Sequence, residues 1–521
     1  MSVKRDLVIL GGGLAGMGLA LQVKQQQPDL HISVVEKNAF PRPPAIAKVG
    51  ESTVEIASFY LSQQLGLEEH LDKSHLRKFG LRLFTGVAQR DFSECDELGP
   101  SKTFGIPTYQ LDRGVLENYL SAQLRAHDIE LIDQADVREI QAADDKSVAF
   151  TTPNGARNLQ SRWLVDSSGR AAILKKNLAL QAPSEHRANA VWFRVDRRVI
   201  VDDWTADQAW QSRSAMPHER WKSTVHLTGA GYWVWIIPLE SGVTSIGIVS
   251  DDIVFNAAKI RTQEDALRWL AQNQPLVAEA IAGAKFLDFV VLPNYAYDCK
   301  KVLSADRWAI SGEAGFFADP FYSPGSDFIA IANGFITSLI ADDRRGSDIQ
   351  LNSVVYEKIF RSIYQNTLSL YTNQYGGFGD RLMMGLKTFW DIAYYWGVLS
   401  LLYFRDALCN YQKMRPLIND LIATQELNQE IQALFRERAK QRLVLPPRGV
   451  FLDQYHVPCL KFFNDVLQKP LDADVQSDLQ QNIKILHCVA GGVAELLRGV
   501  ASAQISPAAR EWLGDDYCSG L

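Results

Sequence analysis

A glycine-rich segment near the N-terminus constrains the fold of this chain more than any other feature. The apolar run Leu7–Leu10 leads into Gly11, Gly13 and Gly16, which have the spacing G-x-G-x-x-G. Glycines at these positions let the backbone turn tightly and come close to a pyrophosphate, whose charge is stabilised by the free N–H groups at the start of a helix. The pattern therefore predicts a strand, a tight turn and a helix that bind a dinucleotide.

A second predicted strand supplies the acidic residue that such a site needs. Residues 31–35 (HISVV) are strand-like and end at Glu36, twenty residues after Gly16. A carboxylate there can accept hydrogen bonds from the hydroxyls of an adenosine ribose. NAD and FAD share this fingerprint, so both remain alternatives at this point, while a glycine turn without a ligand becomes the weaker explanation.

Length and composition limit the classes of protein that remain. A chain of 521 residues exceeds one hydrophobic core, so we expect two or three domains with room for a large cofactor. The 54 Lys and Arg against 60 Asp and Glu give a net charge of -6, which argues against nucleic-acid binding. The six cysteines form no C-x-x-C pair, so we expect reduced thiols and no disulfide framework, zinc site or iron–sulfur cluster. Because residues 1–4 run directly into the first strand, we expect no signal peptide and a cytoplasmic location.

The periodicity of apolar residues changes near residue 345. Earlier segments mix strand-like and helix-like patterns, whereas later ones are almost entirely helical, with apolar residues three to four apart in 417–435 and 485–500. Residues 389–404 form the most hydrophobic window, but Asp391 interrupts it and Arg405 follows it. This window therefore predicts a buried or interface helix and no membrane span.

Two later segments distinguish between the two cofactors. Residues 163–170 (WLVDSSGR) predict a strand that ends at Asp166, and residues 307–315 (RWAISGEAG) predict another that ends near Glu313. A carboxylate at a strand end can hold the ribityl or ribose hydroxyls of an extended cofactor, and a following helix start favours negative charge on a reduced flavin.

The order of these segments resembles that of FAD-dependent monooxygenases of the hydroxybenzoate hydroxylase type. The resemblance includes Arg113 in the sequence QLDR, where family members place an arginine against FAD, and a short strand near Val137 that contacts the adenine. A buried strand and turn would explain each segment alone, but four segments in this order favour FAD.

A narrower resemblance lies in residues 48–53 (KVGEST), which are similar to the V-G-E-A/S-T strap of flavin-dependent halogenases, a strap that lies on the flavin. At a similar spacing from it, Lys78 stands at an expected strand start, like the lysine that those enzymes need. The resemblance implies that this amine hydrogen-bonds hypohalous acid or becomes a haloamine and so delivers an electrophilic halogen. From the residues alone, a solvated lysine among other basic side chains would be favoured.

The most specific match is WVWIIP at residues 233–238, which fits the W-x-W-x-I-P signature of flavin-dependent halogenases. Strand alternation puts Trp233 and Trp235 on one face. The resemblance implies that their rings block an organic substrate from the flavin hydroperoxide, so that halide attacks instead. An aromatic face packed in a sheet is the alternative if the motif is taken alone.

The chain also departs from tryptophan halogenases. Their Glu-Ser-Thr-Gly stretch corresponds here to residues 322–325, so Tyr322 replaces the glutamate that assists at indole. Pro324 has no N–H, which leaves Ser323 and Gly325 as the candidate halide-binding residues. Phenol and pyrrole halogenases also lack that glutamate, and so do halogenase-like flavoproteins that mature tryptophylquinone cofactors.

We therefore expect an FADH2- and O2-dependent halogenase of an electron-rich aromatic substrate, which acts through a flavin hydroperoxide and hypohalous acid. The alternative is a monooxygenase that hydroxylates a Trp side chain of a partner protein in tryptophylquinone biogenesis. No second G-x-G-x-x-G is visible, so reduced flavin is expected from a separate reductase. The expected partners are this reductase, the aromatic substrate and a halide, without nucleic acid or membrane.

The expected fold is α/β: a Rossmann-like FAD-binding domain over residues 1–345, with an antiparallel substrate sheet inserted at about 75–105 and 175–290, and a helical substrate or partner region over 346–521. Lys78, Trp233 and Trp235 are the candidate catalytic residues, and no metal site is expected. The candidate cofactor-binding residues are Gly11, Gly13, Ala15, Gly16, Glu36, Lys37, Val49, Gly50, Glu51, Ser52, Arg113, Val137, Asp166, Glu313 and Gly325.

Overall fold

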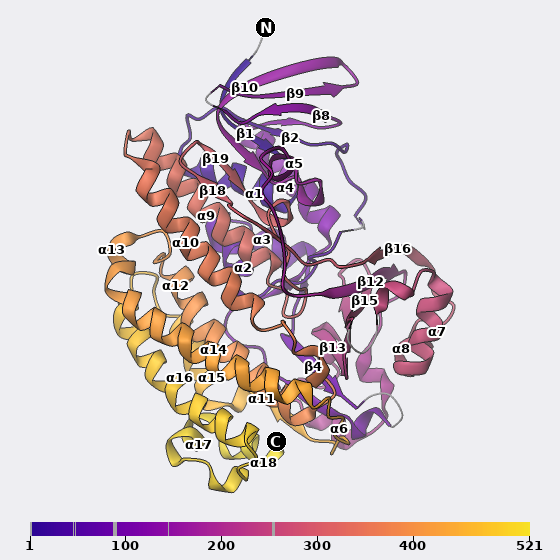
Figure 1. Ribbon diagram of the computed structural model, residues 1–521. Coiled ribbons are helices and arrows are strands. Elements are labelled where there is room, and N and C mark those ends of the chain that lie inside the picture. The colour runs from indigo at the N-terminus through magenta and orange to yellow at the C-terminus, as the bar shows by residue number, and fades with distance from the viewer. Residues whose placement is uncertain (1–2, 45, 47, 87–90, 144, 253–255) are drawn as a thin grey trace. The chain divides into compact units, whose positions relative to one another are not determined.

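The structure is a computed structural model that describes residues 3–44, 46, 48–86, 91–143, 145–252 and 256–521 (Figure 1). The chain divides into two compact units, each made of three separate segments. Unit 1 comprises Met1–His75, Leu111–Ser184 and Ala296–Gln365, and unit 2 comprises Leu76–Gln110, Glu185–Tyr295 and Asn366–Leu521. The predicted division of labour between residues 1–345 and 346–521 stays a prediction.

Unit 1 is built on a sheet with the strand order β18-β19-β10-β1-β2-β7, in which β9 also pairs with β10 and β8 pairs with β9. The strands from β19 to β7 run parallel to their neighbours, and β18, β9 and β8 are antiparallel. The strands of unit 1 are β1 (Val3–Leu10), β2 (Ile32–Val35), β7 (Glu130–Ile132), β8 (Asp136–Gln141), β9 (Lys146–Thr152), β10 (Gly155–Asp166), β18 (Leu303–Ser304) and β19 (Trp308–Ile310), with a separate ribbon of β11 (Gln181–Pro183) and β17 (Tyr297–Cys299).

The centre of this sheet forms as the sequence predicts. Leu7–Leu10 in β1 are fully buried, because a parallel strand is covered on both faces and needs apolar side chains on both. Helix α1 packs against α4 and α9. The helical elements of unit 1 are α1 (Leu14–Gln26), α2 (Glu55–Phe59), η1 (Tyr60–Gln64), α3 (Glu68–Ser74), α4 (Arg113–Ala126), η3 (Gly169–Ala171), α5 (Ile173–Asn177), η7 (Gly312–Ala314), α9 (Gly325–Arg344) and most of α10 (Ile349–Leu368).

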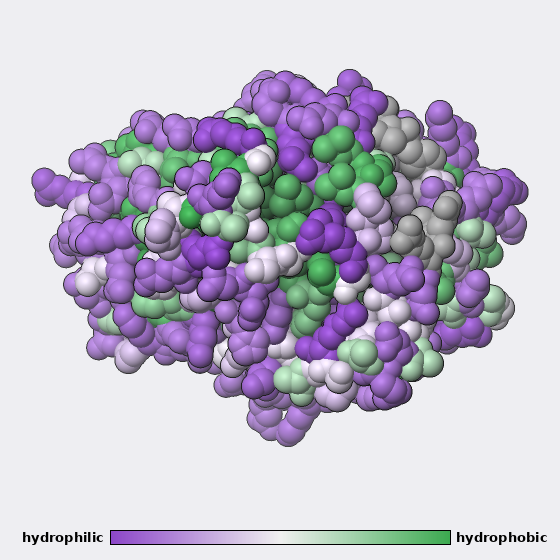
Figure 2. Space-filling model, turned by 90° about the horizontal axis from the view of Figure 1, so that it is seen from below, coloured by the Kyte–Doolittle hydropathy of each residue, from purple (hydrophilic) through white to green (hydrophobic). Residues whose placement is uncertain are grey.

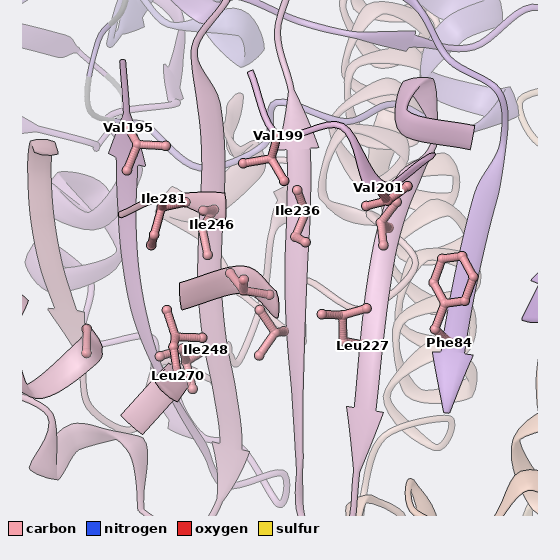
Figure 3. Packing of buried hydrophobic residues seen from close by; sticks show 14 of the residues in the cluster. Phe84, Val195, Val199, Val201, Leu227, Ile236, Ile246, Ile248, Leu270 and Ile281 are labelled. Carbon is pink, nitrogen blue, oxygen red and sulfur yellow. The ribbon is translucent and has the colours of Figure 1, made fainter. Parts of the chain in front are cut away.

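Unit 2 contains a mixed sheet with the order β16-β12-β15-β14-β13-β4-β5-β20. One face of it carries a hydrophobic cluster that includes Val234, Ile236 and Leu227 (Figure 3). Helix α7 closes over this face with Leu270. The strands of unit 2 are β3 (Leu76–Arg77), β4 (Leu81–Thr85), β5 (Asp96–Gly99), β6 (Tyr109–Gln110), β12 (Ala188–Val195), β13 (Thr224–Gly229), β14 (Tyr232–Pro238), β15 (Thr244–Asp251), β16 (Phe286–Leu292) and β20 (Phe451–Asp453).

The C-terminal segment of unit 2 is helical, as its periodicity predicts. The hydrophobic window at 389–404 is a helix with a π-helical stretch, and Trp390 within it is fully buried. The helical elements of unit 2 are η2 (Phe92–Glu94), η4 (Val201–Trp204), α6 (Gln208–Ser212), η5 (Arg220–Lys222), η6 (Ala257–Lys259), α7 (Gln263–Asn273), α8 (Pro275–Ala280), η8 (Tyr375–Gly377), α11 (Arg381–Tyr394), η9 (Tyr395–Ser400), α12 (Leu401–Phe404), α13 (Tyr411–Met414), η10 (Arg415–Leu417), α14 (Ile418–Lys440), η11 (Gln454–His456), α15 (Pro458–Leu467), α16 (Val475–Leu497), η12 (Ser502–Gln504), α17 (Pro507–Leu513) and α18 (Asp515–Gly520).

Helix α14 differs in one respect from its apolar pattern. Ile418 and Ile422 belong to the predicted buried stripe but are 42% and 52% exposed. The buried face of the first turns carries Thr424 and Asn428 instead, and the Asn428 Oδ1 accepts a hydrogen bond from the Trp390 Nε1 at 2.7 Å. Polar packing inside the helical segment therefore replaces part of the predicted apolar contact.

The surface is mostly polar on the face drawn in Figure 2, where hydrophobic residues gather only locally. Within the part of the chain that the structure describes, no helix has both the length and the apolar character needed to cross a bilayer.

Candidate functional site

The glycine turn after β1 requires glycine for steric reasons within the protein itself. A Cβ at Gly11, where φ is +103°, would lie 2.4 Å from the Ser167 carbonyl oxygen, and one at Gly16 would lie 2.0 Å from the Gly11 carbonyl oxygen. Gly13 is different, because the nearest atom to a Cβ there is the Lys48 Nζ at 3.6 Å. Gly13 is also the N-cap of α1 and has no side-chain cap, so the helix start is open to an anion.

Glu36 lies where the sequence predicts it, directly after β2, and it is 7% exposed. Its carboxylate accepts hydrogen bonds from the backbone N–H of Gly12 at 2.7 Å and of Asn38 at 2.8 Å, and it pairs with Arg42 at 3.0 Å. Burial alone would raise the pKa of Glu36, but these two N–H groups and the Arg42 charge outweigh it and lower the pKa. The side chain is therefore a carboxylate that also braces the glycine turn.

A charged cluster that the sequence did not reveal lies beside the turn, with Glu117 of α4 at its centre. The buried Glu117 carboxylate pairs with the Arg42 Nε at 3.0 Å, with the Lys48 Nζ at 2.8 Å and with the Arg113 Nη2 at 3.1 Å. Burial lowers the pKa of Lys48 and Glu117 opposes that shift. Three cations against Glu36 and Glu117 leave one positive charge in excess beside the helix start, which favours a bound diphosphate.

Arg113 also supports the strap predicted at residues 48–53. Its Nη1 donates hydrogen bonds to the carbonyl oxygens of Val49 at 2.9 Å and Gly50 at 3.2 Å. Gly50 has φ of +92°, a conformation that favours glycine, and Glu51 and Ser52 are buried. Arg113 therefore contacts the strap, and a direct contact of Arg113 with the cofactor stays a prediction.

The two predicted strand-end carboxylates differ in their surroundings. Asp166 is fully buried and accepts hydrogen bonds from the backbone N–H of Ser168 at 2.9 Å and of Leu174 at 2.7 Å, so it shapes the turn after β10. Burial raises the pKa of Asp166, and the Ser168 and Leu174 hydrogen bonds oppose that shift. Glu313 lies in η7 and is partly exposed, with the Arg170 Nε at 3.4 Å, which leaves its carboxylate accessible to a ligand.

The turn that leads into α9 has two consecutive residues in the left-handed region. Tyr322 and Ser323 have φ of +68° and +61°, which costs energy for residues other than glycine. The Ser323 N–H donates to the Pro320 carbonyl oxygen at 2.9 Å. Gly325 begins α9, and a Cβ there would meet nothing within 4 Å. There is therefore open space beside the Gly325 backbone, and the role of Ser323 and Gly325 in a halide site stays a prediction.

The other predicted cofactor residues lie in the same unit. Ala15 is in the first turn of α1, Lys37 is exposed after Glu36, and Val137 is in β8. Their contacts with a cofactor remain predictions.

In unit 2, the two signature tryptophans lie on one face of β14, as alternation predicts. The rings of Trp233 and Trp235 are 5.6 Å apart between centroids, and both are nearly fully buried. Their face is opposite to the one that carries Val234 and Ile236, which belong to the hydrophobic cluster. The pair therefore stands apart from the main core of this sheet.

Both indoles are fixed by hydrogen bonds. The Trp233 Nε1 donates to the Tyr375 hydroxyl at 2.9 Å, and the Trp235 Nε1 donates to the Ser245 Oγ at 3.2 Å. Gly247 pairs with Trp235 across β14 and β15, and a Cβ at Gly247 would lie 2.2 Å from the indole ring. Tyr375 and Gly247 position the pair, and no sequence motif pointed to either.

Lys78, the predicted catalytic lysine, is only 4% exposed, so it is not the solvated lysine that its basic neighbours alone would favour. It does not begin a strand, since β3 ends at Arg77 and β4 begins at Leu81. Its backbone N–H donates to the Thr108 carbonyl oxygen at 2.8 Å. The link between β3 and β4 thus holds a buried lysine amine, whose charged form is costly unless the surroundings compensate it.

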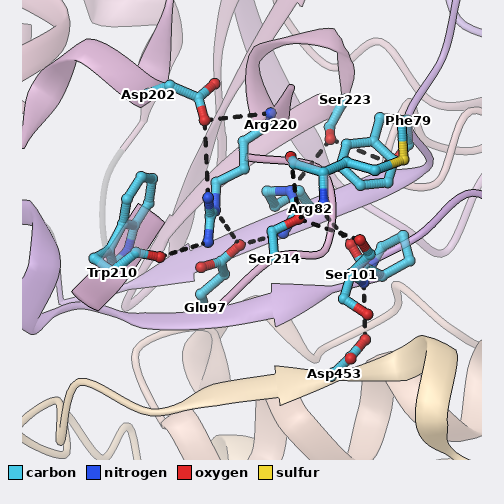
Figure 4. A network of polar contacts seen from close by, with 12 residues as sticks. Phe79, Arg82, Glu97, Ser101, Asp202, Trp210, Ser214, Arg220, Ser223 and Asp453 are labelled. Atoms are coloured by element: carbon cyan, nitrogen blue, oxygen red, sulfur yellow. Dashed lines mark hydrogen bonds and ion pairs between the residues drawn. The ribbon is translucent and has the colours of Figure 1, made fainter. Parts of the chain in front are cut away.

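A buried network of charges lies next to this link (Figure 4). The fully buried Glu97 pairs with Arg82 and, at 2.8 Å, with the Arg220 Nε. The Arg82 Nε donates to the Ser223 Oγ at 3.2 Å, which in turn donates to the Phe79 carbonyl oxygen at 3.3 Å. The network therefore reaches the residue that follows Lys78.

Unit 1 has the features of a dinucleotide-binding α/β oxidoreductase domain: an uncapped helix start at a glycine turn, an excess positive charge beside it and a carboxylate at the end of β2. These residues fit a dinucleotide: the protein itself leaves room for a Cβ at Gly13, so a glycine at this position is explained by a ligand, such as a diphosphate, that would approach the backbone closely. Among the described residues, no group of three or more His, Cys, Asp and Glu side chains is arranged to hold a metal ion.

Comparison with known proteins identifies the family. The tryptophan halogenase family matches residues 6–97 and 85–375, so the chain belongs to this family. Flavin-dependent halogenase chlA of Dictyostelium discoideum is 25% identical over 473 residues, which cover 81% of this chain and 74% of that protein. A 1H-pyrrole-2-carbonyl-(peptidyl-carrier protein) chlorinase of Pseudomonas fluorescens is 23% identical over 406 residues, covering 71% and 83%.

Solved structures agree on the fold. Halogenase PltM matches with a TM-score of 0.68 at 17% identity, covering 99% of this chain and 98% of that chain. PltM in complex with phloroglucinol and FAD matches with a TM-score of 0.68 at 15% identity, covering 99% of each chain. The α/β fold and the flavin-dependent halogenase family read from the sequence are therefore confirmed, while the alternative of a maturation factor gains no support from these proteins.

Proposed function

We propose that this protein is an FADH2- and O2-dependent halogenase of an electron-rich aromatic substrate. The proposal rests mainly on unit 2, which buries Lys78 and fixes the indoles of Trp233 and Trp235 on one face of a sheet. The chain belongs to the tryptophan halogenase family. The named relatives, a flavin-dependent halogenase and a pyrrole chlorinase, support this class of reaction and of substrate.

The cofactor is FAD, and unit 1 carries the residues that would hold it. Gly11 and Gly16 shape the turn and Gly13 would let the diphosphate approach the backbone at the α1 start; Glu36 would accept from the adenosine ribose, and Glu313 would accept from the ribityl hydroxyls. Bound and reduced, FAD would supply two of the four electrons that dioxygen takes up, and the halide would give the other two and so reach the oxidation level of hypohalous acid. The crystal structure of PltM with FAD supports this cofactor.

Lys78 transfers the oxidised halogen to the aromatic substrate. Its ammonium hydrogen-bonds the oxygen of hypohalous acid, or its amine forms an N–halogen bond with the release of water, so that the halogen reaches the aromatic carbon as an electrophile. A nearly dry environment serves the first route, because an ammonium in low dielectric interacts more strongly with its partner than in water. The rings of Trp233 and Trp235 would keep the organic substrate away from the flavin, so that it receives the halogen from Lys78.

The halide binds through the Gly325 N–H at the start of α9, near Ser323. This helix has 20 residues, so its N-terminal N–H groups carry a partial positive charge. Because Pro324 supplies no N–H and the Ser323 N–H is bound to Pro320, few donors remain, and larger halides, which cost less to desolvate, are favoured over chloride.

Reduced flavin comes from a separate reductase, and the protein acts in the cytoplasm. These two parts of the proposal rest on the single G-x-G-x-x-G in the sequence and on six cysteines that form no disulfide.

Replacement of Lys78 tests the proposal. Lys78→Ala should oxidise reduced FAD at the wild-type rate but lose the halogenated product, because the electrophile is no longer delivered. Lys73→Ala is the matched control, since the Lys73 side chain is 71% exposed and pairs with Glu69 on its own helix, so this variant should keep full activity. A Lys78→Ala variant that halogenates at the wild-type rate would remove Lys78 from the mechanism.

A further inference from the structure

His226 lies on the same sheet face as the two signature tryptophans. It is on β13, where it pairs in register with Trp235 on one side and with Leu83 of β4 on the other. Its ring centroid is 5.3 Å from that of Trp233, and the residue is 1% exposed. The imidazole is therefore enclosed between β4 and the indole pair.

The segment before β13 holds the link that contains Lys78. The Phe79 N–H donates to the Lys222 carbonyl oxygen at 3.1 Å, and the Thr224 N–H donates to the Gly80 carbonyl oxygen at 3.1 Å. Thr224 is two residues before His226, so both side chains point to the same face of β13. The backbone thus places the link that contains Lys78 beside the start of β13, the strand that carries His226. The tryptophans lie on β14, on the opposite side of β13 from β4.

The imidazole is neutral in this position. Burial lowers the pKa of His226 to about 3, with a further contribution from the positive charge of Lys78, against backbone hydrogen bonds at Arg82 and Thr224 that raise it. A neutral imidazole presents one nitrogen as donor and the other as acceptor, and it adds no charge that would repel an ammonium.

We propose that His226 is a positioning residue for Lys78, which orients the lysine amine toward the face formed by Trp233 and Trp235. This inference rests on the proposed function, since it names a second residue for the same halogen-transfer step. Each apolar neighbour on β13, Val225 and Leu227, faces the hydrophobic cluster, whereas the His226 face carries the polar Thr224 and Thr228. A residue that only filled space on this face would not need a hydrogen-bond acceptor.

His226→Leu and His226→Gln separate positioning from packing. Both remove the imidazole, but only glutamine keeps a neutral side chain with an acceptor. In the leucine variant we expect the kcat of halogenation to fall roughly 10- to 100-fold while the KM for the aromatic acceptor stays constant, because a misplaced reactive group loses rate without losing substrate contacts. Glutamine should restore most of the rate.

A second readout follows the halogen itself. With catalase present, free methionine is added as a thioether that hypohalous acid oxidises to the sulfoxide. The leucine variant should form more sulfoxide as it forms less halogenated acceptor, while FAD affinity and thermal unfolding match the wild type. A leucine variant with wild-type kcat, a change in KM alone, or a glutamine variant no better than leucine would overturn the proposal.

If His226→Leu does not fold, His226→Asn takes its place, and the shorter amide should give a rate below that of glutamine. Equal rates for asparagine, glutamine and histidine would then contradict the inference. Failure of the proposed function is distinguishable, because in that case the wild-type protein itself would produce neither halogenated acceptor nor sulfoxide in a halide-dependent manner.

Discussion

Two glycines of the same turn should respond differently to alanine. At Gly16 a Cβ would lie 2.0 Å from the Gly11 carbonyl oxygen, whereas real Cβ contacts stay above 3.0 Å, so the turn must open by about 1 Å. Overpacking of this kind costs about 1–3 kcal/mol of folding stability. At Gly13 the nearest atom is the Lys48 Nζ at 3.6 Å, so the protein without cofactor should lose less than about 1 kcal/mol, mainly from the changed N-cap.

For FAD affinity, unlike stability, the Gly13→Ala substitution should also be damaging. If the diphosphate lies against the α1 start, the Gly13→Ala methyl group stands in its path, and the Kd should rise at least about tenfold, equivalent to about 1.4 kcal/mol. Gly16→Ala should lose both stability and affinity. Thermal unfolding of the protein without FAD and titration with FAD by flavin fluorescence measure the two quantities separately.

Gly491 on α16 offers a matched control. A Cβ there meets nothing within 4 Å and the residue is exposed, so Gly491→Ala should gain about 0.5–1 kcal/mol and bind FAD normally. A Gly13→Ala variant that binds FAD as tightly as the wild type would show that the diphosphate does not lie at this turn.

Three further predictions concern unit 2. Gly247→Ala should displace the Trp235 ring, 2.2 Å from the added Cβ, and lower the ratio of halogenated product to oxidised flavin; an unchanged ratio would mean that the indole position is unimportant. Glu97→Gln leaves two buried arginines poorly compensated and should cost about 3–5 kcal/mol in urea unfolding, whereas a loss below about 1 kcal/mol would contradict the charge network. Because the pKa of His226 is about 3 in the folded protein and about 6.5 in the unfolded chain, the unfolded state binds the proton first, so stability is full above pH 6.5 and falls toward pH 3. Between pH 7.5 and pH 5 the wild type should lose about 2 kcal/mol more than His226→Gln, and equal losses would contradict a neutral buried imidazole.

The parts of the fold that the sequence predicts are those set by neighbours along the chain. The strand, turn and helix around Gly11–Gly16 follow from local apolar periodicity and glycine spacing, and the shared face of Trp233 and Trp235 follows from strand alternation. The departures arise from partners that are remote in sequence. Glu117 gathers Arg42 and Lys48 from segments about 70 residues away, and only the folded sheet brings them together.

The burial of polar residues cannot be predicted from apolar periodicity for the same reason. Thr424 and Asn428 occupy the buried face of α14 because each is satisfied there: the Thr424 hydroxyl donates to the Asp420 carbonyl oxygen one turn earlier, and Asn428 bonds Trp390 and Asn366 on other segments, which no periodicity within the helix reveals. Lys78 looks solvated among basic neighbours, yet the link between β3 and β4 buries it. For His226, the available signal was the alternation of polar residues at 224, 226 and 228 with apolar ones at 225 and 227.

Halide-dependent product formation tests the central claim most directly. Wild-type protein is incubated with FAD, a flavin reductase, NADH and chloride, bromide or iodide in turn, with an electron-rich phenol, indole or pyrrole as acceptor, and the acceptor is analysed by mass spectrometry. We predict a halogenated acceptor with at least one halide, in amounts that favour bromide or iodide over chloride and that vanish without FAD. Formation of hydrogen peroxide alone with every halide and acceptor, or of a hydroxylated acceptor irrespective of halide, would contradict the assignment as a halogenase.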